Sequence, residues 1–134
     1  MNTKTPTVSD YMTRSPHSIG FDQTLVRAHE LMREHQIRHL PVLRGGKLVG
    51  MLSERDLAFV EALRDVDPQK LRVEEAMTPL PFTVAPDAPL AGVSREMAEQ
   101  RYGAAVVMRD GHVIGVFTTT DALRALADAL DGKG

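Results

Sequence analysis

The sequence predicts an α/β fold in which two tandem copies of one βαββα unit pack with approximate twofold symmetry into one module. A shift of 65 residues aligns the sequence with itself without a gap, and 13 of the 49 positions from 8 to 56 are then identical. About three identities are expected at ordinary residue frequencies, so we interpret the match as a duplication. Each copy also alternates short apolar runs with segments of helical periodicity. We expect repeat 1 over 8–64, a linker over 65–72 and repeat 2 over 73–131.

The first copy divides into elements by its apolar spacing and its turn residues. Leu25, Ala28 and Met32 recur at helical intervals, which predicts an amphipathic helix. Pro41 stands near the start of a short apolar run, so we expect the first residues of that strand to be irregular. In chain order we expect a helical turn over 8–12, an extended segment over 17–19, a helix over 24–36, a strand over 40–43, a hairpin turn over 44–47, a strand over 48–52 and a helix over 53–63.

The second copy repeats this order. We expect a helix over 89–101, a strand over 105–108, a turn over 110–111, a strand over 113–117 and a final helix over 119–130. In each copy two helices are expected to cover one face of the sheet, and the two sheets to pack against each other. The apolar face of the final helix is wider than one core contact needs. It can pack against its own sheet, form a dimer interface, or do both.

Composition excludes several classes of function. The chain has 134 residues, of which 43% are hydrophobic, and it has no Cys, so disulfides and thiolate chemistry are excluded. No apolar run approaches the ~18 residues of a membrane span, and the N-terminus lacks the apolar stretch of a signal peptide. We therefore expect a cytoplasmic protein without membrane contacts. A net charge of −2 argues against nucleic acid as the main partner, because phosphate backbones require an excess of Lys and Arg.

The most specific motif is Gly-x-x-Ser/Thr-x-x-Asp, which ends at Asp56 in the first copy and at Asp121 in the second. Both motifs stand where a strand is expected to lead into a helix. One interpretation is a capping box, in which Ser53 and Asp56 satisfy each other's backbone amides. The other is a ligand site. A helix N-terminus after Gly offers free amides to phosphate, and an ionised Asp accepts hydrogen bonds from both hydroxyls of a ribose.

Basic residues occur where an anionic ligand would need them. Arg55 lies inside the first motif, and Arg38 and His39 immediately precede the predicted strand over 40–43. These last two also suit a solvated helix end, where cations complement the helix dipole. No nucleophile–base pair, Walker loop or set of His residues at metal-ligand spacing is present. We therefore expect no catalytic residues and no tightly bound metal.

The order of the motifs resembles a known family. Val8-x-Asp-x-Met-Thr-x-x-Pro is followed by a helix that leads into Ile37-Arg38-His39-Leu40-Pro41-Val42, and then by the motif ending at Asp56. This order resembles a cystathionine β-synthase (CBS) domain, and its doubling over about 8–125 resembles a Bateman module. The resemblance implies that AMP, ADP or ATP, or sometimes S-adenosylmethionine, binds in two clefts between the copies. The motif Asp would hold the ribose, and the adenine would lie against the other copy.

Carried over position by position, the resemblance assigns ribose and phosphate contacts in one cleft to Asp56, Ser53, Arg55, Arg38 and His39, and in the other to Asp121, Thr118 and Thr120. It assigns the adenine of the first cleft to Thr78, Pro81, Thr83, Tyr102 and Ala104, and that of the second to Thr13, Pro16, Ser18, Ile37 and His39. Gly103 and Ala104 replace the basic pair of the first copy, and Thr120 replaces its Arg. We therefore expect the cleft at Asp56 to be the better nucleotide site.

The motifs and the resemblance support two functions from different classes. The first is a regulatory sensor that binds an adenine nucleotide, with Mg²⁺ possible only alongside ATP, and that signals as a homodimer or through a client protein. Nucleotide binding would then bias the orientation of repeats or subunits, which a partner reads. The alternative is a structural or dimerising interaction module without a physiological nucleotide. A ligand that binds only the folded state raises the melting temperature, and this effect discriminates between the two.

Overall fold

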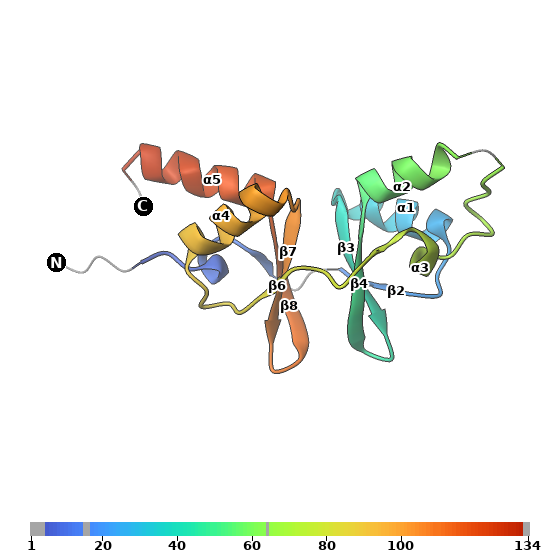
Figure 1. Cartoon of the computed structure of the whole chain (residues 1–134), viewed down its shortest axis with the longest axis horizontal. Coiled ribbons are helices and arrows are strands. Elements are labelled where there is room, and N and C mark those ends of the chain that lie inside the picture. Colours follow the sequence, from blue (N-terminus) through green and yellow to red (C-terminus); the bar gives the residue numbers. More distant parts are fainter. Residues whose placement is uncertain (1–4, 15–16, 64, 133–134) are drawn as a thin grey trace. The chain divides into compact units, whose positions relative to one another are not determined.

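The computed structural model of the protein describes residues 5–14, 17–63 and 65–132. The chain divides into two compact units. The continuous unit is His17–Pro81, and the split unit combines Met1–Pro16 with Phe82–Gly134. Each unit holds one four-stranded sheet together with helices (Figure 1). The prediction of a mixed α/β fold with two similar units is therefore confirmed.

The continuous unit has a mixed sheet in the strand order β2-β3-β4-β5. Strand β2 is parallel to β3, and the other two pairings are antiparallel. Its elements in chain order are β2 (Ile19–Gly20), α1 (Leu25–His35), β3 (His39–Arg44), β4 (Lys47–Ser53), α2 (Glu54–Glu61), α3 (Val73–Ala76) and β5 (Thr78–Pro79). Helices α1 and α2 lie on the same face of the sheet (Figure 1).

The split unit repeats this plan in the strand order β1-β8-β7-β6. Its elements are the 3₁₀ helix η1 (Val8–Asp10), β1 (Thr13–Arg14), β6 (Thr83–Val84), α4 (Leu90–Gln100), β7 (Ala104–Arg109), β8 (His112–Thr118) and α5 (Thr119–Leu130). Helix α5 is tied to the N-terminal segment by the Tyr11 hydroxyl, which donates to Asp128 Oδ2 at 2.6 Å. The predicted bounds of the final helix, 119–130, are those observed.

The two copies exchange their first segments, which the sequence did not lead us to expect. Strand β1 belongs to the first copy by sequence but pairs with β8, with Thr13 opposite Val116. Strand β5 starts the second copy but pairs with β4, with Thr78 opposite Met51. Two-residue strands carry no measurable alternation, so periodicity could not reveal them. As a result, each sheet contains an edge strand from the copy that does not supply its hairpin.

The exchanged strands explain the glycine of the repeated motif. A Cβ atom on Gly115 would lie 2.6 Å from Met12 Sδ and 2.9 Å from the carbonyl oxygen of Thr13. At Gly50 the corresponding distances, to Met77 Sδ and Thr78 O, are 2.5 and 3.0 Å. Real Cβ contacts under 3.0 Å essentially do not occur, and a contact of 3.0 Å is tighter than nine in ten of those observed. The motif therefore starts with glycine because a neighbouring strand packs directly against the backbone.

Each unit has its own apolar core between the sheet and its two long helices. In the continuous unit, Leu25 and Met32 of α1 pack with Leu57 of α2 onto Leu40 and Leu52 of the sheet. In the split unit the equivalent core residues are Val8, Met12, Leu90, Val93, Met97, Ala105, Val107 and Phe117. The helical periodicity noted in the sequence thus corresponds to residues that face the sheet.

One expected irregularity is misplaced. Pro41 lies inside the regular part of β3, opposite Met51, and is not at an irregular start. The register shifts instead between Val42 and Leu43, where Val49 of the partner strand is left without an opposite residue. Such a one-residue bulge locally kinks the strand and increases its twist. The second hairpin has the same shift, between Val107 and Met108.

The leucines of α5 do not pack into the core of the split unit. Ala122 and Ala125 pack against the core of the split unit. Leu123, Leu126 and Leu130 remain 64%, 52% and 78% exposed. Ala122 and Ala125 therefore face the sheet of this unit, whereas the three leucines of the helix face outward.

Candidate functional site

The motif that ends at Asp56 forms the junction of β4 and α2. Ser53 is the N-cap, and its Oγ accepts a hydrogen bond from the amide of Asp56 at 3.0 Å. Asp56 Oδ2 accepts from the amide of Ser53 at 2.9 Å. The capping-box interpretation is therefore correct for this pair of bonds. It uses only one oxygen of a half-buried carboxylate, so capping does not exclude a ligand role for the other oxygen.

That second oxygen, Asp56 Oδ1, faces a threonine of the exchanged strand. Thr78 Oγ1 donates to it at 3.4 Å, at the long limit of hydrogen bonding. The resemblance assigned Thr78 to the adenine, whereas the structure places its hydroxyl beside the carboxylate. A weak hydroxyl donor is easily exchanged for a ligand hydroxyl. The Asp56 carboxylate is thus only lightly engaged on the side away from its cap.

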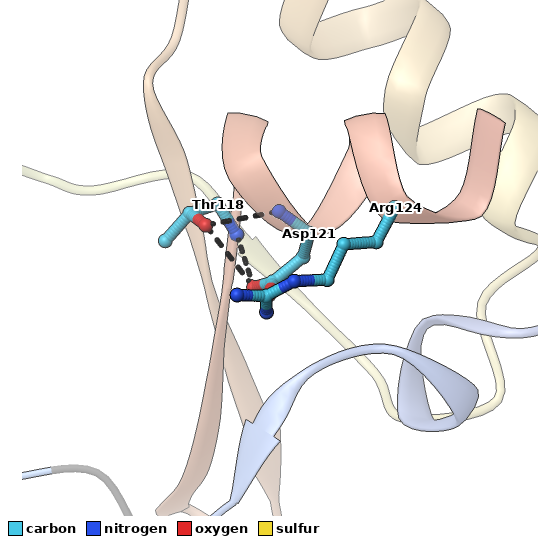
Figure 2. A network of polar contacts seen from close by, with 3 residues as sticks. All are labelled: Thr118, Asp121 and Arg124. Carbon is cyan, nitrogen blue, oxygen red and sulfur yellow. Dashed lines mark hydrogen bonds and ion pairs between the residues drawn. The ribbon is translucent and has the colours of Figure 1, made fainter. Parts of the chain in front are cut away.

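The motif that ends at Asp121 has the same cap but is more fully engaged (Figure 2). Asp121 Oδ2 accepts from the amide of Thr118 at 2.9 Å and from its hydroxyl at 3.1 Å. The other oxygen, Oδ1, accepts from Arg124 Nη1 at 3.2 Å. Asp121 is only 2% exposed. Both of its carboxylate oxygens therefore already have partners within the split unit.

The expectation of free amides for phosphate at these helix starts is wrong in part. The Glu54 amide donates to the carbonyl of Arg38 at 2.9 Å, and the Thr119 amide donates to the carbonyl of Gly103 at 3.1 Å. The amides of Asp56 and Asp121 donate to their caps. The adjoining hairpin and the capping side chains satisfy these groups, which the sequence pattern could not show. The motifs consequently present carboxylates rather than a row of unpaired amides.

The basic residues near Asp56 differ in charge. His39 starts β3 opposite Ser53 and is half-buried. Burial lowers the pKa of His39, which Arg38 lowers further, while Asp56 and Glu54 oppose the shift. His39 is therefore neutral at pH 7 and offers a ring N–H rather than a positive charge. Arg38 is exposed and lies 3.9 Å from Glu54 Oε2, measured from its Nε, and Arg55 is exposed on the first turn of α2.

The residues assigned to adenine are distributed over both units. Thr78 and Pro81 lie in the continuous unit with Asp56, and so do Ser18, Ile37 and His39. Thr13, Thr83, Tyr102 and Ala104 lie in the split unit with Asp121, Thr118 and Thr120. Tyr102 is 40% exposed, and its ring packs obliquely against Phe82, with 5.1 Å between ring centroids. Pro16 falls outside the described residues. These assignments to adenine stay predictions.

Arg124, the partner of Asp121, was not among the residues predicted from the sequence. The signal was present, because Arg124 follows Asp121 by three residues, and residues at this spacing are neighbours on a helix. The corresponding position in the first copy is Phe59, which is exposed. No arginine therefore stands at the matching place beside Asp56.

The part of the chain that the structure describes holds no cluster of three metal ligands and no helix suited to span a membrane. Among the described residues, no three His, Asp or Glu side chains gather in a way that could hold a metal ion. No helix within 5–14, 17–63 and 65–132 is long and apolar enough to cross a membrane.

The comparisons with known proteins agree on one family. The CBS domain model matches residues 8–62 and 73–128. The chain is 35% identical to inosine-5′-monophosphate dehydrogenase of Korarchaeum cryptofilum over 85% of its own length but only 22% of that enzyme's. It is 28% identical to the CBS domain-containing protein YhcV of Bacillus subtilis, over 85% of this chain and 81% of YhcV.

Solved structures of similar proteins hold adenosine compounds. The CBS domain pair of MJ0100, in complex with 5′-methylthioadenosine and S-adenosyl-L-methionine, superposes with a TM-score of 0.83 at 26% identity, over 94% of this chain and 99% of that one. CBSX2 in complex with AMP superposes with a TM-score of 0.80 at 27% identity, over 91% and 97% of the two chains.

Proposed function

This chain belongs to the CBS domain family, with two CBS domains in tandem, and on this basis we propose that it is a regulatory module that binds an adenine nucleotide. The observation that carries the proposal is the Asp56 carboxylate. One of its oxygens caps α2, and among the described residues the other accepts a hydrogen bond only from the Thr78 hydroxyl, at 3.4 Å. The two hydroxyls of a ribose are donors that such an oxygen accepts well. Asp56 is the proposed ribose residue, and Asp121 is its counterpart.

The ligands of the similar structures support adenosine as the recognised group. AMP, S-adenosyl-L-methionine and 5′-methylthioadenosine share adenosine and differ in what the ribose 5′ position carries. Two of the three have no phosphate. The amides of Glu54 and Asp56 already donate within the chain, so the helix start offers little to a phosphate. The proposed selectivity is therefore for adenosine, with the phosphates left to Arg38, Arg55 and the neutral His39.

The module is proposed to act through protein contacts, as a homodimer or on a client protein. Leu123, Leu126 and Leu130 form an outward apolar face on α5 and are all more than half exposed. Faces of this kind commonly mark contacts with another protein. No metal belongs to the proposed site, and any Mg²⁺ would arrive with ATP. The alternative function, a structural module that only dimerises, shares the apolar face but not the ligand.

Binding is tested by thermal unfolding and calorimetric titration with AMP, ATP and S-adenosylmethionine. A ligand at about 100 times its Kd stabilises the folded state by ~2.7 kcal/mol, which raises the melting temperature by several degrees in a domain of this size. A melting temperature unmoved by all three compounds would support the structural module instead.

The decisive variant is Asp56→Asn. The amide side chain keeps an oxygen that can accept from the Ser53 amide, so the cap is retained, while the charge that favours ribose hydroxyls is lost. Hydrogen bonds to a charged group are worth ~1.5–3 kcal/mol, so affinity should fall about tenfold or more. Asp10→Asn is the matched control, because Asp10 closes the same kind of capping box on η1. Equal affinities for Asp56→Asn and Asp10→Asn would refute the assignment of the ribose.

A further inference from the structure

The two motif carboxylates differ in which group occupies their second oxygen. Asp56 Oδ1 accepts from a neutral hydroxyl at 3.4 Å, whereas Asp121 Oδ1 accepts from a guanidinium at 3.2 Å (Figure 2). Asp56 is half-buried, and Asp121 is 2% exposed. The same sequence motif therefore produces one carboxylate that is open to a donor and one that is already paired.

The Arg124 guanidinium occupies the place of a ligand's donor. The remaining oxygen of Asp121 is taken by the Thr118 amide and hydroxyl, so the carboxylate has no oxygen without a partner. A ribose hydroxyl that is to bind Asp121 Oδ1 competes with Arg124 for an oxygen that is already in an ion pair, on a residue that is only 2% exposed. The Arg124 side chain is 70% exposed, so displacement moves it into solvent without disturbing the core.

We propose that Arg124 is a specificity-determining residue that closes the Asp121 site to adenosine, and thereby makes Asp56 the principal site of the module. This inference rests on the proposed function. The Arg124 contact is a second reason to expect weaker ligand binding at Asp121, in addition to the loss of basic residues at Gly103, Ala104 and Thr120. Those residues concern the phosphates of a ligand, while Arg124 concerns the carboxylate that would hold its ribose.

The likeness of the two caps supports a local origin for this effect. Phe59 stands where Arg124 stands, three residues after Asp56, and cannot donate to a carboxylate. The backbone capping bonds are the same in both motifs, since Ser53 and Thr118 each accept from the Asp amide three residues later. A side chain, rather than the backbone of the junction, thus determines which group pairs with the second carboxylate oxygen.

Adenosine is the probe that isolates this effect. It carries no phosphate, so removing a positive charge cannot weaken its binding through charge attraction. The experiment measures adenosine affinity by calorimetry for the wild type, Asp56→Asn, Asp121→Asn, Arg124→Ala and the double variant Asp56→Asn/Arg124→Ala. In the Asp56→Asn background, Arg124→Ala should tighten binding about two- to fivefold, the range expected for loss of a competing ion pair with an exposed partner.

Two further variants separate a specific effect of Arg124 from a general loss of charge or stability. Arg95→Ala removes an exposed arginine from α4 of the same unit and should leave adenosine affinity unchanged. Arg124→Met keeps the aliphatic stem but no donor, and it serves if Arg124→Ala lowers the stability of the unit. A merely structural contact would not raise affinity when it is removed, so a gain separates this role from a stabilising one.

Each remaining outcome has one meaning. Unchanged affinity in the Arg124 variants of a protein that binds adenosine overturns the inference and leaves the proposed function intact. Weaker binding also overturns it, because Arg124 would then be a ligand contact. Loss of binding in Asp121→Asn but not in Asp56→Asn overturns it as well, since Asp121 would already be open. An absence of binding in the wild type and every variant overturns both the inference and the proposed function.

Discussion

Replacement of Gly115 by alanine tests the edge strand that the first copy lends to the second. The new Cβ would lie 2.6 Å from Met12 Sδ and 2.9 Å from the carbonyl oxygen of Thr13. The sulfur ends a flexible side chain and can move, but the carbonyl belongs to β1, which pairs with β8 at this point. Strand β1 must therefore shift, and overpacking of this kind costs ~1–3 kcal/mol.

The assay is urea unfolding of Gly115→Ala followed by circular dichroism. For a slope of ~1–3 kcal/mol per molar urea, the midpoint should fall by about 1 M. In a Met12→Ala background the contact with the sulfur disappears and the contact with the Thr13 carbonyl remains. The cost of Gly115→Ala should then shrink without vanishing, which a double-mutant cycle measures.

Gly92 provides a control, because alanine at this position should raise the free energy of unfolding rather than lower it. It lies inside α4, and a Cβ placed there would meet nothing within 4 Å. Gly92→Ala should therefore stabilise the protein by ~0.4–1 kcal/mol through helix propensity and a less flexible unfolded chain. A Gly115→Ala protein whose free energy of unfolding stays within about 0.5 kcal/mol of the wild type would refute the close packing of β1 on β8.

Two predictions concern pH. The pKa of His39 is lowered by burial, so the unfolded chain takes up a proton at a higher pH than the folded chain does. The contribution of neutral His39 to the free energy of unfolding is therefore fully present above the unfolded pKa of ~6.5. It is lost as pH falls from that value through the lower folded pKa. Urea unfolding from about pH 7.5 to 5 should show a smaller loss for His39→Asn than for the wild type, whereas the exposed His112→Asn control should not differ. The pKa of Tyr11 is raised by its hydrogen bond to Asp128, so this bond stabilises the fold below about pH 10 and is lost as pH rises through the folded pKa. Tyr11→Phe should be less stable at neutral pH and should lose less than the wild type at alkaline pH; identical profiles would contradict the bond.

Much of the fold could be predicted because its signals are local or periodic. The 65-residue repeat identified two similar units, and apolar spacing placed α1 and α4 within one residue of their observed bounds. The capping interpretation of Ser53 and Asp56 also proved correct, because it depends on residues three apart. These features need no knowledge of distant parts of the chain.

Apart from Arg124, which lies three residues after its partner Asp121, the features that escaped prediction depend on contacts between segments that are distant in the sequence. The partner of β1 lies about a hundred residues away, in β8, and a two-residue strand gives no pattern to find it by. The same holds for Thr78 and Asp56, which meet only because β5 pairs with β4. The amides at the helix starts were expected to be free. The structure pairs them with the carbonyls of Arg38 and Gly103, which adjoin the other strand of each hairpin, and the motif itself does not show these partners.

The exchange of first segments has a consequence for the order in which the chain can fold during its synthesis. The continuous unit has all four of its strands once residue 81 has been made. The split unit must wait, because β1 is made before the continuous unit and its partner β8 is made after it. Pairings between distant segments also form slowly. During synthesis we therefore expect the continuous unit to fold while β1 still has no sheet to join.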